Sequence, residues 1–389
     1  MFRKIPTALL QLRYQKRRLM VALLGVSFTV VIIFMQLGLR DALFDSSVRF
    51  HKSLKGDCFL ISQRSPSLVA MDNFTSRRLF QTLAFSEVEF VAPVYVRFIQ
   101  WKNFQNRDYW RNIFLIGFDL RDEIFDLPGV AENLDKLKLP DHVLFDRNSR
   151  SEYGEVVKQL EQQEKIQTEI RYEGNNKTIK IVGLFSLGTS FGVDGNLLTS
   201  NLNFIRIVKN QTIGSINLGV IKLKPGVNIQ EFKVKLREYL PKDVKVLTKE
   251  ELIHFEKNYW YKGTALGFIF TLGVALGIVV GVIIVYQILY TNISEHLSEY
   301  ATLKAIGYKH KYLLFMVLQQ STLISLLGYI PGIIISELLY EFTQRSTLLP
   351  IAMTFNRAIQ VFFLTLIMCF LSGITAIRKL KSADPAEIF

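Results

Sequence analysis

The sequence contains residue types that can do chemistry, but not at the spacings at which they act together. Its five histidines are His51, His142, His254, His296 and His310, and no two of them form the H-E-x-x-H pattern of a zinc site. Neither the G-x-x-x-x-G-K-[ST] loop that cradles nucleotide phosphates nor the G-x-S-x-G turn of a serine nucleophile occurs. We therefore expect a non-catalytic chain that binds no metal and no cofactor of its own.

The clearest chemical cluster lies at residues 292–314, NISEHLSEYATLKAIGYKHKYLL, between two long apolar runs. Ser294 is placed to cap a helix, acidic residues follow near its start, and Gly307 stands just past its end. We predict a short helix whose side chains Tyr300, Leu303 and Ile306 stay partly exposed, which suits it to a groove on a partner protein. The residues that we assign to this contact are Glu295, Glu299, Tyr300, Leu303, Lys304, Ala305, Ile306 and Gly307.

Four almost uncharged runs are long enough for membrane spans. Residues 19–39, 264–290, 313–339 and 358–377 each meet the length of about 20 residues that a helix needs to cross the hydrocarbon layer. Long helices of a soluble protein normally carry a polar stripe, and these runs have none. The first run is longer than the apolar part of a secretory signal and lacks a cleavage site after it, so we interpret it as an uncleaved anchor.

Basic residues set the expected orientation. Six basic residues and no acidic residue precede Leu19, which places the N-terminus in the cytoplasm by the positive-inside rule. Four spans return the C-terminus to the same side, and much of the formal net charge of +13 lies beside the spans, so it does not indicate nucleic-acid binding. We expect a multi-pass protein of a bacterial inner membrane. The expected boundaries are a basic N-terminus at 1–18, spans at 19–39, 264–290, 313–339 and 358–377, a periplasmic domain at 40–262, a cytoplasmic coupling loop at 291–312, a short periplasmic loop at 340–357 and a cytoplasmic tail at 378–389.

The segment between the first two runs has the size of one or two domains rather than of a loop. Strand-like runs such as VEFVAPVYVRFIQW and KTIKIVGLF alternate with helical stretches, which predicts an α+β domain. The stretch KLKPGVNIQEFKVKLREYLPKDVKVLT predicts a strand, a turn at Pro225 and Gly226, an amphipathic helix and a second strand. Cys58 falls in this domain and Cys369 in the last run, so we expect Cys58 to be a packed or free thiol. The predicted fold class is a membrane protein of four transmembrane α-helices with a large extracytoplasmic α+β domain between helices 1 and 2.

The two edges of this domain are predicted to be helical. Thr248 with Glu251 three residues later is the pattern in which two side chains cap each other's amides at a helix start. Tyr259 and Trp260 follow on that helix and suit a membrane interface, where an apolar ring and a polar edge are both satisfied. We expect both edge helices to continue into the neighbouring spans and to transmit motion, with a passive stalk as the alternative.

Glycine spacing predicts close helix packing in the second run. Gly273, Gly277 and Gly281 recur every four residues, a strip that lets backbones approach within or between subunits. The alternative is that a membrane helix simply tolerates these glycines. The runs contain almost no ionisable residue, which argues against an ion channel or a proton-coupled carrier. Pro331 is expected to kink the third run.

Two motifs resemble those of a known family. EYATLKAIGYKHKYL resembles the E-x-x-x-L-K-A-[LI]-G segment of FtsX/MacB-like permeases, which in that family contacts the cytosolic ATPase of an ABC transporter. The tail KLKSADPAEIF resembles the family's closing motif, here Asp384, Pro385 and Glu387. Span order, one large outer domain and both termini inside agree over the whole chain. Segments such as LKLPDHVLFDR and VIIVYQILYTNISEHLSEYATLKAIGY are similar to the DevC branch, known from cyanobacterial heterocyst exporters.

The resemblance implies the type VII ABC transporter architecture and a mechanism of mechanotransmission. Two ATPase subunits, which hold the ATP and Mg, would push on a homodimer of this chain at residues 299–307, and the stalk helices would pass the motion to the outer domains. The resemblance also implies a periplasmic adaptor (membrane fusion protein), a TolC-like outer-membrane channel and, in the DevC branch, efflux of glycolipid.

Other function classes stay open at this point. The same motion could activate an external cell-wall hydrolase, as in the FtsX branch, or release lipoproteins, as in the Lol branch. A membrane-anchored sensor without an ATPase is a third alternative. Genes for an adaptor and an ATPase beside this one would favour the exporter, a lone ATPase gene the transducer, and neither of them the sensor.

Overall fold

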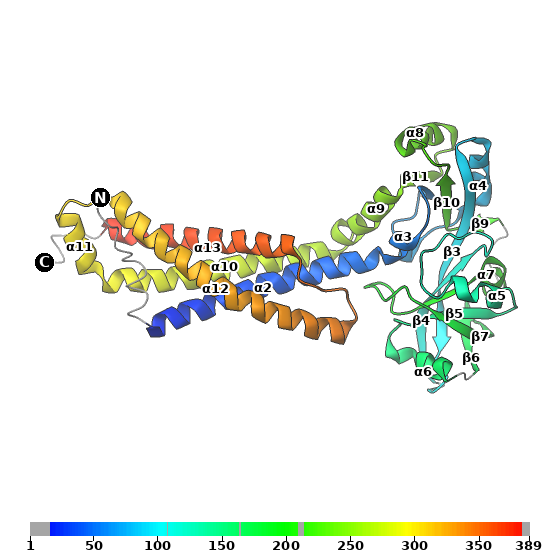
Figure 1. The fold of residues 1–389 in the computed structure, drawn as a ribbon, viewed down its shortest axis with the longest axis horizontal. Helices are drawn as coiled ribbons and strands as arrows, with labels where there is room; N and C mark the ends of the chain where they lie inside the picture. The colour runs from blue at the N-terminus through cyan, green and yellow to red at the C-terminus, as the bar shows by residue number, and fades with distance from the viewer. Residues whose placement is uncertain (1–15, 107, 163–164, 209–213, 383–389) are drawn as a thin grey trace. The chain divides into compact units, whose positions relative to one another are not determined.

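The computed structural model describes residues 16–106, 108–162, 165–208 and 214–382 and divides into two compact units (Figure 1). We call Met1–Ala42 with Ala265–Phe389 the helical unit and Leu43–Thr264 the α+β unit. Helix α2 (Lys16–Ser47) begins in the first and ends in the second. Four long apolar helices with an α+β domain between the first and the second confirm the predicted fold class.

Among its described residues, the helical unit contains four helices long and apolar enough to cross a membrane. They are α2, α10 (Ala265–Glu295), α12 (His310–Thr347) and α13 (Phe355–Ser382), and the short α11 (Leu297–Ala305) lies between α10 and α12. Each long helix is longer than the apolar run predicted for it and exceeds the roughly 20 residues that the hydrocarbon layer requires. Pro331 lies inside α12, which continues on both sides of it.

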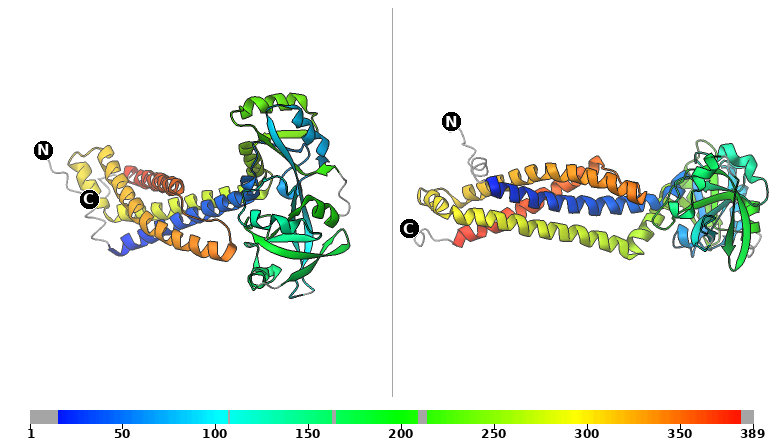
Figure 2. Two further views of the ribbon diagram at one scale, coloured as in Figure 1. Left: turned by 45° about the vertical axis from the view of Figure 1, so that its right-hand side comes forward. Right: turned by 90° about the horizontal axis from the view of Figure 1, so that it is seen from below.

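Small side chains bring the long helices together, and the helices run side by side in both views of Figure 2. Ser27 Oγ on α2 donates a hydrogen bond to the carbonyl oxygen of Gly328 on α12 at 2.8 Å. Ser372 Oγ on α13 donates to the carbonyl oxygen of Val282 on α10 at 3.0 Å. Such contacts hold membrane helices together because a bilayer supplies no hydrophobic drive between them.

The α+β unit is built on a nine-stranded mixed sheet of order β11-β1-β10-β3-β4-β8-β5-β7-β6. Its strands are β1 (Cys58–Ser62), β3 (Val88–Lys102), β4 (Trp110–Phe118), β5 (His142–Asp146), β6 (Ile166–Tyr172), β7 (Asn175–Phe185), β8 (Asn196–Ser200), β10 (Leu218–Leu223) and β11 (Val244–Thr248). The shorter elements are β2 (Phe74–Thr75), β9 (Ser215–Ile216), α3 (Arg49–Ser53), α4 (Ser76–Gln81), α5 (Leu134–Leu137), α6 (Val156–Glu161), α7 (Asn201–Ile207), α8 (Ile229–Tyr239) and α9 (Lys249–Lys262).

Strand β3 organises the sheet because it pairs with three partners. Its first half pairs with β10 and its second half with β4, while Gln100 lies opposite Arg171 of β6. The β3–β6 pairing closes β3, β4, β8, β5, β7 and β6 into a ring, which leaves these strands fewer open edges. The buried rings of Trp101, Phe145 and Tyr153 pack together in an apolar core of the unit.

The predicted strand, turn, helix and strand correspond to β10, α8 and β11. Gly226 adopts a φ of 85°, a conformation that glycine accepts without strain, and Asn228 caps α8. The helix buries Phe232 and Leu236. Strand β1 lies between β10 and β11 and is antiparallel to both. Strands β10 and β11 therefore run parallel to each other without pairing directly.

Candidate coupling site

Helix α11 forms where the sequence predicts a short helix, but it begins later. Helix α10 continues through Ser294 to Glu295, so the prediction that Ser294 caps α11 is wrong. The His296 amide donates to the Asn292 carbonyl at 3.2 Å, and the Tyr300 amide donates to the His296 carbonyl at 3.1 Å. The backbone bonding of α10 therefore leads directly into α11, and few free amides are left for a cap.

The end of α11 is fixed by glycine. Gly307 has a φ of 101°, as its position past the helix end predicts, and no atom lies within 4 Å of where a Cβ would stand. The Tyr308 amide donates to the Leu303 carbonyl at 3.0 Å. This bond from the residue after the glycine back into the last turn ends a helix and reverses the chain.

Tyr300 anchors α11 and is not an exposed contact, which corrects the prediction. Its exposed fraction is 3%, and Ala301 beside it is also buried. The Tyr300 hydroxyl bonds to the side chain of Gln320 on α12, and burial raises the pKa of Tyr300 to about 12. Gln320, itself fully buried, also accepts from Asn292 of α10 at 3.4 Å. One buried amide thus joins α10, α11 and α12.

Other residues in and next to α11 are exposed. Glu299 is exposed and lies 2.9 Å from the Nδ1 atom of His296, Leu303 is half-buried, and Ile306, directly after the helix, is 70% exposed. Just beyond the helix, the exposed rings of Tyr308 and Tyr312 lie in tilted contact at a centroid distance of 4.7 Å. Glu295 is exposed at the end of α10, and Lys304 and Ala305 lie within α11. Asp384, Pro385 and Glu387 lie outside the described residues.

The glycine strip of α10 packs within the same chain. A Cβ at position 277 would lie 3.2 Å from Ile32 of α2, and Gly273 faces Gln36 of the same helix. Gly281 faces Met368 of α13 together with Thr29 of α2, and a Cβ there would overlap both side chains. The strip therefore seats α10 against α2 and α13.

The predicted reciprocal cap begins α9 and is confirmed. Thr248 Oγ1 accepts from the Glu251 amide at 3.3 Å, and Glu251 Oε2 accepts from the Thr248 amide at 3.0 Å. Helix α9 ends at Lys262 and α10 starts at Ala265, so the prediction of one continuous helix is wrong. The break falls at Gly263, because glycine is a poor helix former. In addition, the Thr264 hydroxyl donates a hydrogen bond to the Trp260 carbonyl oxygen at 2.6 Å and so competes with the backbone for that acceptor.

Trp260 belongs to the interior of the α+β unit, which corrects its prediction as an interface residue. It is 9% exposed, and its ring packs edge-on against Phe191 at 5.5 Å. Its indole Nε1 donates to Glu256 Oε1 at 2.8 Å, so its polar edge needs no contact with water or headgroups. Tyr259 is half-buried and packs against the Trp260 ring at 5.3 Å.

A buried acid and a buried imidazole meet beneath Trp260. Glu256 Oε2 on α9 accepts from the Leu68 amide at 2.7 Å and lies 3.7 Å from His51 Nε2 on α3. Both side chains are 1% exposed. Burial raises the pKa of Glu256 to about 7 and lowers the pKa of His51 to about 3. No local pattern predicts this pair, because His51 and Glu256 are far apart in the sequence and each stands among ordinary helix charges.

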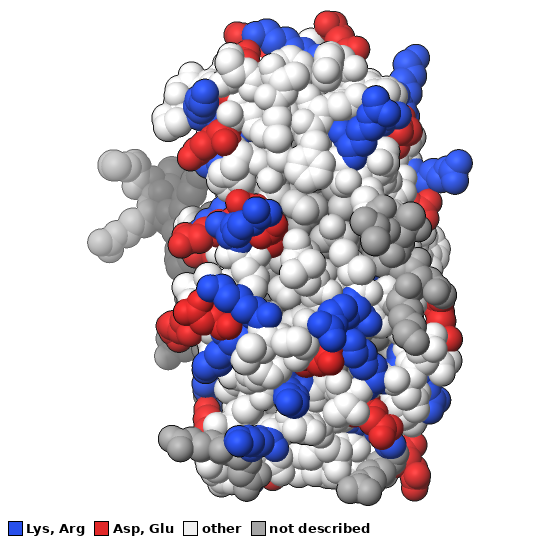
Figure 3. Space-filling model, turned by 90° about the vertical axis from the view of Figure 1, so that its right-hand side faces the viewer, with Lys and Arg blue, Asp and Glu red and all other residues white. Residues whose placement is uncertain are grey.

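Cys58 is a buried free thiol, as predicted. Within residues 16–382, gaps excepted, no three His, Cys, Asp or Glu side chains are grouped to hold a metal ion. On the face of the α+β unit shown in Figure 3, Lys and Arg are interspersed with Asp and Glu, in contrast to the single-signed stripe that follows a nucleic-acid backbone.

Residues 271–385 match the family model of the FtsX-like permease C-terminal domain, a stretch that includes α11, α12 and α13. Two solved structures are similar to part of the chain. One is the periplasmic region of MacB from Actinobacillus actinomycetemcomitans, with 10% identity over 53% of this chain and 94% of that one and a TM-score of 0.36. The other is the extracellular domain of the noncanonic ABC-type transporter YknZ from Gram-positive bacteria, with 12% identity over 50% of this chain and 99% of that one and a TM-score of 0.32. No curated protein matches the chain.

Proposed function

We propose that this chain, with its FtsX-like permease domain, is the non-catalytic membrane subunit of an ABC-type transporter, and that α11 receives the motion of a separate cytosolic ATPase. The observation that carries the proposal is that Tyr300 holds α11 to α12 while Ile306, the residue directly after α11, is 70% exposed. The absence of a phosphate loop from these residues agrees with a separate subunit as the source of the work.

The anchoring of α11 suits the transfer of force. A helix that hangs from flexible linkers would absorb a push by moving alone. Here Gln320 bonds to Tyr300 of α11 and to Asn292 of α10, so displacement of α11 would shift α10 and α12 together. Because α10 is closely packed on α2 and α13 through its glycines, the whole helical unit would share the displacement.

Two chain connections would carry this motion to the α+β unit. Helix α2 is unbroken from Lys16 to Ser47 and is therefore a stiff rod across the boundary at Ala42. The second connection is interrupted at residues 263–264, between α9 and α10, which makes it the more compliant one. With α2 stiff and residues 263–264 able to bend, a shift of the long helices would rotate the α+β unit.

The finer parts of the proposal rest on the sequence. Six basic residues before Leu19 favour a cytoplasmic N-terminus, which puts α11 in the cytoplasm and the α+β unit in the periplasm. The resemblance to the DevC branch supports a homodimer, a periplasmic adaptor, a TolC-like channel and an envelope cargo such as glycolipid. A cyanobacterial origin rests on the same resemblance.

The proposal is tested by truncating two apolar side chains at the end of α11. In the double variant Leu303→Ala with Ile306→Ala we expect normal levels in the membrane, because Ile306 is 70% exposed and Leu303 half-buried. Truncating an interface anchor costs about 2 kcal/mol or more, roughly thirtyfold in affinity. Co-purification of the partner ATPase and ATPase-driven export should therefore be lost together.

The matched control is Leu202→Ala, since Leu202 is also 70% exposed but lies on α7 of the α+β unit. It should leave ATPase binding unchanged. Full ATPase binding by the α11 double variant would show that α11 is only a connector between α10 and α12. Hydrolysis of ATP by the purified chain alone would contradict its assignment as a non-catalytic subunit.

A further inference from the structure

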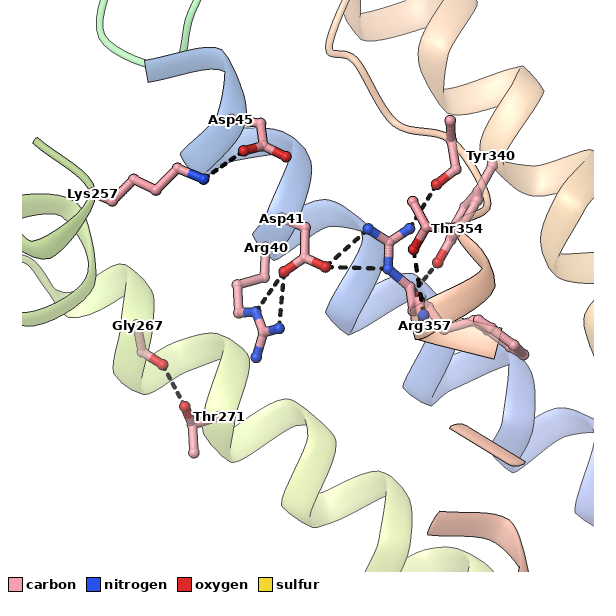
Figure 4. A network of polar contacts seen from close by, with 11 residues as sticks. Arg40, Asp41, Asp45, Lys257, Gly267, Thr271, Tyr340, Thr354 and Arg357 are labelled. Atoms are coloured by element: carbon pink, nitrogen blue, oxygen red, sulfur yellow. Dashed lines mark hydrogen bonds and ion pairs between the residues drawn. The ribbon is translucent and has the colours of Figure 1, made fainter. Parts of the chain in front are cut away.

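An ion pair between a buried arginine and a partly exposed aspartate joins α2 to the first turn of α13 within the helical unit (Figure 4). Arg357 is 6% exposed, and its Nε and Nη2 atoms donate to Asp41 Oδ2 at 3.2 and 2.9 Å. Its Nη1 atom donates to the carbonyl oxygen of Ala352 at 2.7 Å. The guanidinium is thus held on one side by α2 and on the other by the segment between α12 and α13.

Helix α12 meets the same point through Tyr340. The Arg357 guanidinium lies 5.6 Å from the centroid of the Tyr340 ring, and the Tyr340 hydroxyl donates to the carbonyl oxygen of Phe34 on α2. The Tyr340 ring fills the space that a Cβ at Gly38 would need, so α2 and α12 are in direct contact. Three of the four long helices are therefore fixed to one another around this arginine.

Asp41 pairs with two arginines, which differ in how deeply they are buried. Asp41 Oδ1 accepts from Arg40 at 2.9 and 2.8 Å, and the Arg40 side chain is 27% exposed, against 7% for Arg357. Loss of the Arg357 charge would leave Asp41 paired with Arg40. Loss of the Asp41 charge would leave a buried guanidinium without its counter-ion, which is far more costly.

Asp41 occupies the position in α2 where a fixed point matters most. Ala42 is the last residue of α2 that belongs to the helical unit, and the helix continues from there to Ser47 in the α+β unit. The part of α2 beyond its last contact with the other long helices can follow their displacement only through that contact. Apolar contacts between smooth helices allow sliding, whereas a charge pair with hydrogen bonds fixes both register and rotation.

We propose that Asp41 and Arg357 are a positioning pair that couples α12 and α13 to α2 at the point where α2 leaves the helical unit, so that motion of the helices drives the α+β unit. This inference rests on the proposed function, since it supplies the last link between α11 and the α+β unit. The pair touches neither a nucleotide nor a cargo, and its role is to keep α2 from slipping.

The test measures motion directly, because a merely structural pair would affect only the amount of folded protein. Cys58 and Cys369 are replaced by Ala, and spin labels are attached to cysteines at Lys52, exposed on α3, and Phe342, 69% exposed on α12. Pulsed-EPR distances are recorded on the full chain with its co-purified ATPase, without nucleotide and with ATP and vanadate. We expect nucleotide to populate a second distance in the otherwise unaltered chain.

The variant Arg357→Gln should bind the ATPase normally and lower the ratio of shifted to unshifted molecules about tenfold, as the loss of a charge-assisted contact predicts. Arg357→Lys keeps the charge without the forked geometry and should give an intermediate ratio. The control is Arg345→Gln, because Arg345 lies on the same side of the helical unit near the end of α12, in an exposed pair with Glu341 at 3.7 Å. It should leave the ratio unchanged.

An unchanged ratio in Arg357→Gln would overturn the positioning pair and leave the proposed function standing. If Arg357→Gln fails to accumulate in the membrane, Arg357→Lys decides: a reduced ratio supports the pair and a full ratio overturns it. A chain with the native pair that shows no nucleotide-dependent distance, although its ATPase is bound, would overturn the proposed function and the pair together.

Discussion

The buried pair of His51 and Glu256 should give the α+β unit two opposing pH dependences that single substitutions separate. Both side chains are 1% exposed, and their Nε2 and Oε2 atoms lie 3.7 Å apart. We consider Glu256→Gln, which keeps the shape and the acceptor for the Leu68 amide, and His51→Gln, which removes the imidazole. Each variant is compared with the native chain at every pH, so that the titration of groups outside this pair cancels.

The Glu256 carboxyl binds its proton more tightly in the folded state, because burial raises its pKa from 4.5 to about 7. Its contribution to stability is fully present below pH 4.5 and is lost as the pH rises through 7. Between pH 5 and pH 8 this amounts to roughly 2–3 kcal/mol. Relative to the native chain, Glu256→Gln should therefore gain roughly 2–3 kcal/mol of unfolding free energy as the pH is raised from 5 to 8.

The His51 imidazole has the opposite sign. Burial lowers its pKa from 6.5 to about 3, so its neutral form is favoured in the folded state and acid favours the unfolded chain. Its unfavourable contribution grows from nearly zero at pH 8 to about 2 kcal/mol at pH 5. Relative to the native chain, His51→Gln should therefore gain about 2 kcal/mol as the pH is lowered from 8 to 5.

Tryptophan fluorescence provides a selective assay on the full chain in detergent. The three tryptophans, Trp101, Trp110 and Trp260, all lie in the α+β unit, so their emission reports the unfolding of that unit in urea. Midpoints rather than intensities are compared, because Trp260 contacts Glu256. The matched control is Glu250→Gln, an exposed glutamate on the same helix α9, which should follow the native profile.

The two variants should change the pH dependence of the unfolding free energy in opposite directions. A Glu256→Gln chain that follows the native profile from pH 5 to pH 8 would mean that Glu256 ionises at its ordinary pKa despite its burial. If both variants shifted in the same direction, the two groups could not be titrating as their burial requires.

Three further outcomes are expected. Gly281→Val places side-chain atoms where Met368 packs and should lower the stability of the helical unit by about 1–3 kcal/mol, measured as a fall in melting temperature in detergent; an unchanged melting temperature would mean that α10 and α13 can separate freely there. Thr248→Ala removes the acceptor for the Glu251 amide and should cost the α+β unit about 1 kcal/mol in urea unfolding followed by tryptophan fluorescence. A cysteine at Lys304, in a chain without other cysteines, should be labelled by an impermeant reagent only after cells are opened; labelling in intact cells would reverse the proposed orientation.

Features that depend on local sequence were predictable. Spans follow from the length of uncharged runs, and the cap of α9 needs only Thr248 and Glu251 three residues apart. Gly307 was correctly placed at the end of α11 because a positive φ at that position favours glycine whatever surrounds it. The chain by itself thus determined four helices, an α+β domain between the first two, and a short helix with an exposed side.

Features that depend on contacts between distant segments were not predictable. Ser294 resembles a cap in sequence, yet backbone bonding across His296 removes the need for one. Tyr300 and Trp260 resemble exposed aromatics, but Gln320 and Glu256 satisfy their polar atoms and allow them to be buried. The Asp41 and Arg357 pair spans 316 positions. Tertiary structure decided these cases because burial and pairing depend on which side chain lies opposite, and no periodicity along the chain records that.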